Sequence, residues 1–168
     1  MNQKKPRIDV PLTPFDLWMD RFSFFIFFAI WTYVVLNYSN IPETIPLHFD
    51  AQGNADHFGS KQSIWLLMGI MSLLFVGIYI LGKYPHLHNY TITITEQNAL
   101  KNYRFSTRLL RFVNLFDLIL FAYIVKQTLR AEVETTSRLG SWFLPLVLGG
   151  SGIFLIAVFI YVNKLNSN

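Results

Sequence analysis

The chain has 168 residues, of which 52% are hydrophobic and only 14% are charged. A soluble domain carries about 25% charged residues because its surface faces water, so this composition favours a protein whose surface faces lipid. The absence of cysteine excludes a disulfide framework, a thiol nucleophile and a cysteine metal site. The formal net charge of +4 comes from basic residues beside apolar runs rather than from one basic patch, so we expect no direct nucleic-acid binding.

The N-terminal segment carries the signals of a helix start. Thr13 is a typical N-cap residue, Pro14 suits the first helical position, and Asp16 places an acid in the first turn. A helix is therefore predicted to begin here and to run into the first apolar segment. No small-residue cleavage site follows that segment, so we expect this helix to be retained.

Four apolar segments have the length that crosses a bilayer, about 20 residues. They are residues 22–38, 64–82, 109–125 and 142–162. The first, second and fourth are uncharged and have no polar face, which argues against a soluble helical bundle. We predict an all-α membrane protein with four transmembrane helices, in which residues 1–168 form a single integral membrane domain that contacts the lipid bilayer.

The distribution of basic residues predicts the orientation. Ten of the 14 Lys and Arg residues fall on the side of the N-terminal tail, the connection between the second and third spans, and the C-terminal tail, which leaves four on the other side. The side richer in Lys and Arg faces the cytoplasm. Both termini are therefore predicted to be cytoplasmic, and residues 41–61 to form a structured extracytoplasmic loop of a multi-pass protein of the cytoplasmic (inner) membrane.

This outer loop is the densest polar segment of the chain. Pro42 and Pro46 bias their preceding residues towards extended backbone, and Gly53 and Gly59 permit turns. Lys61 precedes the second span, where it is either an interfacial anchor or the partner of an acid in the loop, for which Asp56 is the candidate.

Four side chains of the loop are candidate ligands of a divalent cation, although their spacing matches neither an EF-hand nor a helical histidine pair. These weak candidates are His48, Asp50, Asp56 and His57. A loop held together by polar contacts is the preferred interpretation, and we expect no cofactor.

The third span is preceded by a change of pattern. Residues 91–95 alternate Thr and Ile, which predicts a short extended piece, and Thr95 can cap a helix that runs from Glu96 to Val125. That helix would be longer than the bilayer core, so its first turns should protrude into the cytoplasm.

Within this helix a polar path leads from the cytoplasmic side into the bilayer. Arg104, Arg108 and Arg111 recur at intervals of four and three on one face, and Asn114 and Asp117 continue the path. An ionisable residue at membrane depth supports a functional hypothesis, here a proton or ion site at Asp117. A lone carboxylate beside an asparagine often serves instead to join helices by polar contacts, and this is the preferred interpretation. The arginines are most simply orientation determinants. No motif of a phosphate loop, a helical histidine pair or a nucleophile elbow is present, so we expect no enzymatic activity.

Residues 41–61, followed by a span, resemble a bacterial membrane domain of unknown function that occurs alone and at the N-terminus of the Sdp-type (sporulation-delaying protein) immunity proteins. The resemblance covers about residues 15–125 and rests on two motifs. The outer-loop motif comprises Pro46, His48, Phe49, Gly53, Asp56 and Lys61. The motif on the other side comprises Glu96, Asn98 and Tyr103, with Arg104 and Arg108 following it.

The resemblance implies toxin immunity or signal relay, because the longer immunity proteins protect against a secreted toxin and sequester a cytoplasmic repressor. On this hypothesis the outer loop recognises a secreted peptide or toxin through His48, Asp56 and Lys61. The stretch from Glu96 to Arg108 would be the surface for a cytoplasmic regulator. The alternative is a small transporter or transporter accessory subunit that uses Asp117, for which assembly into a homo-oligomer would widen a thin pathway.

Overall fold

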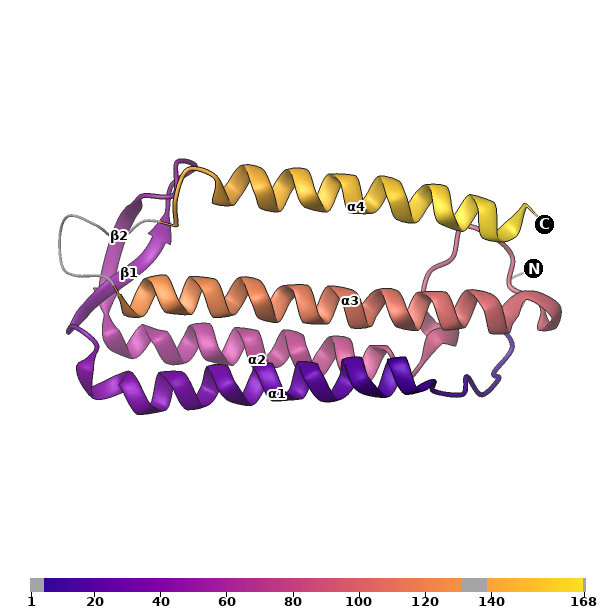
Figure 1. Ribbon diagram of the computed structural model, residues 1–168, viewed down its shortest axis with the longest axis horizontal. Helices are drawn as coiled ribbons and strands as arrows, with labels where there is room; N and C mark the ends of the chain where they lie inside the picture. Colours follow the sequence, from indigo (N-terminus) through magenta and orange to yellow (C-terminus); the bar gives the residue numbers. More distant parts are fainter. Residues whose placement is uncertain (1–4, 131–138, 168) are drawn as a thin grey trace. The chain divides into compact units, whose positions relative to one another are not determined.

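The structure is a computed structural model that describes residues 5–130 and 139–167 (Figure 1). Its long helices are α1 (Pro14–Asn37), α2 (Ile64–Leu81), α3 (Glu96–Leu129) and α4 (Phe143–Asn166). Between α1 and α2 lie two strands, β1 (Thr44–Phe49) and β2 (Ala55–Ser60), and the short 3-10 helices are η1 (Tyr38–Asn40), η2 (Lys61–Ser63) and η3 (Pro85–Leu87). The protein is thus mostly helical, but the structured loop is a β-hairpin that the all-α prediction did not include.

The chain divides into two compact units. The first comprises Met1–Leu36 and Trp65–Tyr123, which hold α1, most of α2 and most of α3. The second comprises Asn37–Ile64 and Ile124–Asn168, which hold the hairpin, the end of α3, and α4.

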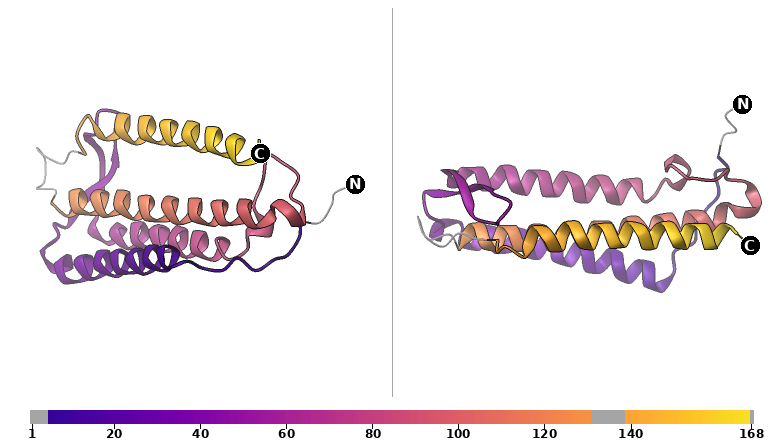
Figure 2. Two further views of the ribbon diagram at one scale, coloured as in Figure 1. Left: turned by 45° about the vertical axis from the view of Figure 1, so that its right-hand side comes forward. Right: turned by 90° about the horizontal axis from the view of Figure 1, so that it is seen from above.

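In the first unit α1, α2 and α3 lie side by side (Figure 1 and the left view of Figure 2). Aromatic rings join α1 to α2: the ring of Phe24 lies 5.0 Å from that of Phe75 and 5.1 Å from that of Tyr79, both edge-on. Phe27 stacks on Phe75 at 4.6 Å. Such pairs stabilise a packing beyond the area they bury, by about 0.5–1.5 kcal/mol each, so they fix how α1 and α2 meet.

The predicted start of α1 is confirmed, because the helix begins at Pro14 with Thr13 as its cap. The hydroxyl Oγ1 of Thr13 accepts from the backbone N–H of Asp16 at 3.3 Å, and the carboxylate of Asp16 accepts from the backbone N–H of Thr13 at 2.8 Å. This reciprocal pair satisfies backbone donors that a helix start leaves unpaired.

Three of the described helices are long and apolar enough to cross a membrane. They are α1 with η1 (Pro14–Asn40), η2 with α2 (Lys61–Leu81), and α4 (Phe143–Asn166), and they identify a membrane protein. The predicted spans 22–38, 64–82 and 142–162 fall largely within them. The predicted span 109–125 lies in α3, which is not among the three, so the four-span count stays a prediction. Lys4 and Arg138, which entered the orientation count, lie outside the described residues.

A small hydrophobic core lies at the start of α3 in the first unit. Tyr103 and Ala99, both fully buried, and Ile94 pack with apolar residues of the N-terminal segment. The hydroxyl of Tyr103 donates to the carbonyl of Pro6 at 2.8 Å. The predicted extended piece at residues 91–95 forms no strand, and α3 begins at Glu96 as expected.

In the second unit the strands pair antiparallel from Thr44–Ser60 to Phe49–Ala55. The buried apolar side chains of residues 41–64 are Ile41, Ile45, Pro46 and Ile64. No described residue of α4 is buried.

Candidate functional site

The turn of the hairpin is closed by Asp50. Its carboxylate Oδ1 accepts from the backbone N–H groups of Gln52 at 2.9 Å and Asn54 at 2.8 Å, and the backbone N–H of Asp50 donates to the carbonyl of Asn54 at 2.8 Å. The hydrogen bonds from Asn54 and Gln52 to the charged carboxylate hold the pKa of Asp50 below its usual range. Asp50 therefore has a structural role in the turn. The sequence indicated it only as a weak candidate for a metal ligand.

Two glycines allow close contacts around the hairpin. Gly53 has φ of +78°, and a Cβ at this position would lie 2.6 Å from the carbonyl oxygen of Gly140. The carbonyl of Gly53 also accepts from the backbone N–H of Leu139 at 2.7 Å, which docks the segment before α4 against the turn. At Gly59 a Cβ would lie 2.4 Å from Cδ1 of Leu47. Gly53 is therefore required by its positive φ and by the backbone of Gly140. Gly59 lies within β2 rather than in a turn, and its neighbour is the end of the flexible Leu47 side chain, so the prediction of a turn at Gly59 is wrong.

The base of the hairpin is closed by Lys61. Its Nζ donates to Oε1 of Glu43 at 2.8 Å and lies over the ring of Tyr38, 5.5 Å from its centre. The backbone N–H of Lys61 donates to the carbonyl of Glu43 at 2.9 Å. The prediction that Lys61 pairs with Asp56 is wrong. Lys61 pairs with Glu43, because the strand pairing brings residues 43 and 61 together at the end of the hairpin opposite the turn.

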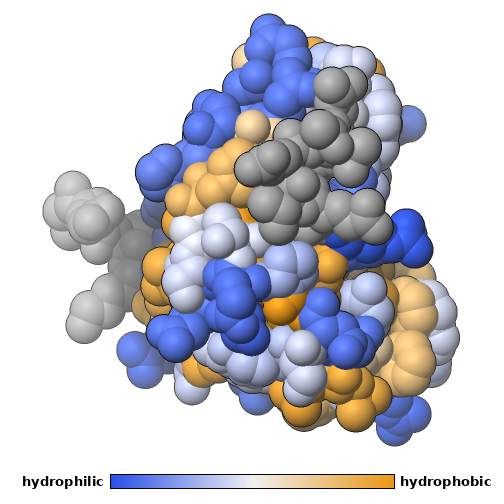
Figure 3. All heavy atoms as spheres, turned by 90° about the vertical axis from the view of Figure 1, so that its left-hand side faces the viewer, coloured by the Kyte–Doolittle hydropathy of each residue, from blue (hydrophilic) through white to orange (hydrophobic). Residues whose placement is uncertain are grey.

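Asp56 is instead the partner of His48. Nδ1 of His48 lies 2.6 Å from Oδ1 of Asp56. The register is irregular on both sides of His48, which pairs with His57, so Leu47 and Asp56 have no direct cross-strand partner. Such bulges re-aim side chains. The side chains of His48 and Asp56 remain 67% and 45% exposed. Figure 3, viewed from the side at which Figure 1 draws the hairpin, shows hydrophilic and hydrophobic residues intermixed.

The remaining members of the loop motif have packing positions. Pro46 is buried and pairs with Phe58, and Phe49 pairs with Ala55. Among residues 5–130 and 139–167, no three His, Cys, Asp or Glu side chains gather in a way that could hold a metal ion. His48, Asp56, Asp50 and His57 thus do not form one cluster.

The hairpin lies within the part of the chain that matches a family model. Residues 25–72 match the model of a domain of unknown function (DUF1648). An uncharacterized protein of Archaeoglobus fulgidus is 36% identical over 73 residues, which cover 44% of this chain and 40% of that protein. The chain thus matches less than half the length of this curated relative. No solved structure matches the chain.

The second predicted motif is largely built into the fold at the start of α3. Oδ1 of Asn98 accepts from the backbone N–H of Thr95 at 2.9 Å and so caps the helix. Tyr103 is fully buried, and burial raises the pKa of its hydroxyl. Arg104 is half-buried, with its Nε lacking a hydrogen-bond partner among the described residues. Glu96, in contrast, is exposed at the first position of the helix.

Two arginines of α3 form ion pairs with α1. Nε of Arg108 lies 2.8 Å from Oδ1 of Asp16, and Nε of Arg111 lies 2.9 Å from Oδ1 of Asp20. Sequence reasoning gave these arginines no protein partner. The signal was present, because Asp16 and Asp20 are four residues apart and therefore share a helix face.

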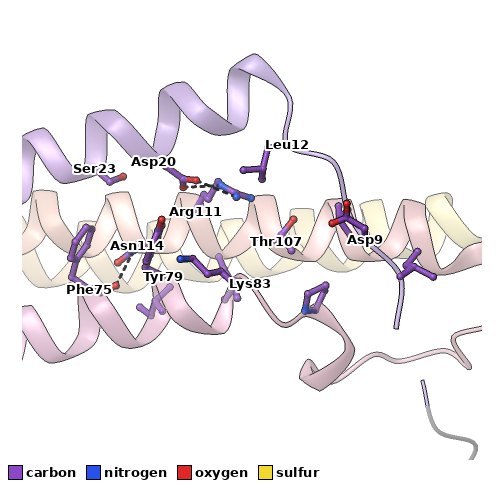
Figure 4. A pocket seen from close by; sticks show the side chains of 16 residues that line it. Asp9, Leu12, Asp20, Ser23, Phe75, Tyr79, Lys83, Thr107, Arg111 and Asn114 are labelled. Carbon is purple, nitrogen blue, oxygen red and sulfur yellow. Dashed lines mark hydrogen bonds and ion pairs between the residues drawn. The ribbon is translucent and has the colours of Figure 1, made fainter. Parts of the chain in front are cut away.

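A cavity of about 300 Å³ lies within the first unit, between α1, α2, α3 and the N-terminal segment (Figure 4). Its wall includes the Asp20–Arg111 pair, Lys83 and Asn114, together with apolar side chains such as Phe75 and Tyr79. Nδ2 of Asn114 donates to the carbonyl of Phe75 at 3.2 Å. Asn114 thus joins α3 to α2 and at the same time lines a cavity, which its sequence position alone did not predict.

Asp117 lies one turn beyond Asn114 on α3 and is half-buried. No hydrogen bond or ion pair joins its carboxyl group to any residue within 5–130 and 139–167, and it is not part of the cavity wall. The polar path predicted along α3 is therefore divided: its arginines and Asn114 contact α1 and α2, whereas Asp117 does not.

Proposed function

We propose that this protein is a non-enzymatic, multi-pass protein of the bacterial cytoplasmic membrane whose hairpin recognises a secreted peptide or toxin, in immunity or signal relay. The observation that carries the proposal is the His48–Asp56 pair, held at 2.6 Å and yet largely open to solvent. The match of residues 25–72 to a domain of unknown function and the resemblance of the loop motif to Sdp-type immunity proteins support it.

The loop motif separates into residues that build the hairpin and residues that it presents. Gly53 and the backbone of Lys61 make contacts that hold the hairpin together, at its turn and at its base. An exposed pair of polar side chains such as His48 and Asp56, in contrast, contributes only about 0–1 kcal/mol to stability. A pair that stabilises so little and is still held in one geometry is suited to contact a ligand, with the Asp56 carboxylate as acceptor and the imidazole of His48 as an additional polar group.

The proposal includes a topology of four spans with both termini in the cytoplasm. It is supported by the position of α3, which lies alongside α1 and α2 in the first unit (Figure 2), and by the excess of basic residues on the side of the N-terminal segment. The hairpin would then face the outside of the membrane, where a secreted peptide arrives.

Signal relay requires a surface on the other side, and we place it at the start of α3. The exposed Glu96 is available to a cytoplasmic regulator, whereas the buried Tyr103 supports this surface by packing beneath it. Glu96→Lys is therefore expected to weaken binding of a regulator without loss of the membrane fold.

The experiment is cross-linking in intact cells that express a C-terminally tagged protein, followed by mass spectrometry of exported peptides that co-purify. The test variant is the His48→Ala/Asp56→Ala double mutant, and the matched control is His57→Ala, which changes an exposed histidine on the same hairpin. We expect an exported peptide with wild type and control but not with the double mutant. Equal recovery by all three, at equal abundance in the membrane, would contradict the recognition role.

A second candidate function is transport, because the half-buried carboxyl group of Asp117 has no partner within residues 5–130 and 139–167. On this hypothesis Asp117 carries a proton or ion within the membrane, and several copies assemble around the pathway. Proteoliposomes that contain a trapped pH-sensitive dye would report proton flux. Loss of flux in Asp117→Asn, with flux retained in the hairpin double mutant, would favour transport. Unchanged flux in Asp117→Asn would eliminate it.

A further inference from the structure

The cavity of the first unit contains an acceptor that nothing satisfies within the described part of the chain. Asn114 is only 5% exposed, and its Oδ1 has no hydrogen-bond partner. A buried acceptor left unpaired costs about 1–3 kcal/mol. The side chain cannot relieve this by rotating its amide through 180°, because its Nδ2 already donates to the carbonyl of Phe75, which accepts only. The cavity therefore presents a hydrogen-bond acceptor that requires a donor from elsewhere.

The same cavity contains a cation without a carboxylate partner among residues 5–130 and 139–167. Nζ of Lys83 lies over the ring of Tyr79, 4.4 Å from its centre, and no ion pair of Lys83 accompanies this contact. Tyr79 precedes Lys83 by four residues, so this contact directs the ammonium group back along α2, the helix that carries Phe75, whose carbonyl accepts from Asn114. The other cation of the wall, Arg111, is neutralised by Asp20.

Oδ1 of Asn114 requires a hydrogen-bond donor, and the exposed ammonium group of Lys83 can pair with an anionic group, so a ligand that carries both groups would match the site. Figure 4 shows Lys83, Arg111 and Asn114 around the same space. At about 300 Å³, the cavity is at the lower end of the range for small-molecule sites. Its wall is partly apolar, and the connection after α2 places it near the end of a membrane helix, where lipid headgroups lie.

We propose that this cavity binds a primary ammonium group linked to a phosphate, the chemistry of phosphoethanolamine. The phosphate would pair with Lys83. The ammonium group would donate to Oδ1 of Asn114, with the carboxylate of Asp20 in the same wall. This group occurs in a phospholipid headgroup and as a free zwitterion. The inference concerns a site in the first unit and does not depend on the function proposed for the hairpin.

The test compares two lipids that carry the same phosphate. The full chain is purified in detergent, and native mass spectrometry measures the occupancy of phosphatidylethanolamine and phosphatidylcholine at equal concentrations. The trimethylammonium group of phosphatidylcholine has no N–H and cannot donate to Asn114. We expect phosphatidylethanolamine to bind roughly tenfold more tightly, as a hydrogen bond from a charged donor predicts. Equal affinity for the two lipids would overturn the proposal.

Variants connect the binding to the cavity. Lys83→Gln changes an exposed side chain and should leave the fold intact, with several-fold weaker binding of phosphatidylethanolamine. Lys126→Gln, an exposed lysine at the far end of α3, is the matched control and should bind as wild type does. Unchanged affinity in Lys83→Gln would place the lipid elsewhere and contradict the proposal. Added phosphoethanolamine distinguishes the sources: competition supports a site for the free zwitterion, and preference for the lipid without competition supports a lipid site.

Discussion

The carboxylate of Asp50 accepts two backbone N–H groups of the hairpin turn, and its pKa lies below the ordinary value of 3.8 because these bonds favour the charged form. The turn therefore gains stability that is fully present above pH 3.8 and is lost as the pH falls through the lowered pKa. We predict that carbon NMR of the Asp50 carboxyl group gives a titration midpoint below 3.8. The amide signals of Gln52 and Asn54, which donate to this group, should shift with the same midpoint. A midpoint at or above the ordinary value, or amide signals that do not follow it, would show that the turn is closed in another way.

Gly53 combines a positive φ with contact to Gly140, so a side chain at this position is strained twice. We predict that Gly53→Ala destabilises the hairpin by about 1–2 kcal/mol from the backbone conformation alone, and by more through the clash with Gly140. The matched control is Gly69→Ala in α2, where a Cβ meets nothing within 4 Å and helix propensity improves by up to about 1 kcal/mol. Limited proteolysis at the hairpin in detergent measures the difference. Equal protection of both variants would contradict the contact with Gly140.

At the scale of elements, α1 is joined to α3 through Asp16, whose carboxylate also takes part in the reciprocal hydrogen bonds with Thr13 at the start of α1. Oδ2 of Asp16 accepts from Thr13, and Oδ1 accepts from Arg108. Loss of a buried partner costs about 3–5 kcal/mol, but Arg108 keeps 34% of its side-chain surface exposed. We therefore predict that Asp16→Ala destabilises the protein by roughly 2–3 kcal/mol, measured by thermal unfolding in detergent.

The control for this pair is Asp9→Ala, which removes an exposed acid of the N-terminal segment and should change stability little. The double variant Asp16→Ala/Arg108→Ala should be less destabilised than the sum of the two single variants, because it leaves no unpaired buried charge. Strict additivity would show that the two side chains do not interact.

Features that are specified by neighbouring residues in the sequence could be predicted. Contacts between residues that are far apart in the sequence could not. The cap at Thr13 is local, and the apolar runs that became α1, α2 and α4 are visible to any hydropathy count. The hairpin was missed because Pro46 and Gly59 fall inside its strands, where such residues argue against a strand, and because its bulges break the alternation. The His48–Asp56 pair and the partners of Arg108 and Arg111 depend on which segments meet in the fold, which spacing within one helix does not show.

At the scale of the whole molecule, the number of membrane spans depends on whether α3 crosses the bilayer. Its 34 residues would extend about 51 Å as a helix, more than the roughly 30 Å of a hydrocarbon core. The polar residues of α3 lower its mean hydropathy, so hydropathy alone does not identify it as a membrane span. Arg111 nevertheless pairs with Asp20 of α1, and Nδ2 of Asn114 donates to the carbonyl of Phe75 in α2. Polar groups satisfied inside a bundle are tolerated at membrane depth. The ion pair of Arg111 therefore removes one obstacle to crossing, whereas Asp117 has no hydrogen bond or ion pair within residues 5–130 and 139–167.

Single cysteines decide between three and four spans, and the natural sequence contains no cysteine that would give background labelling. Gln52→Cys marks the hairpin turn, Gln97→Cys the start of α3, and Ser167→Cys the end of α4. With four spans, Ser167→Cys lies on the same side as Gln97→Cys; with three, it lies on the side of Gln52→Cys. We predict that a membrane-impermeant maleimide labels only Gln52→Cys in intact cells, and that all three are labelled after permeabilisation. Labelling of Ser167→Cys together with Gln52→Cys in intact cells would show that α3 does not cross, and the basic residues of α3 would then lie at the surface rather than within the bilayer.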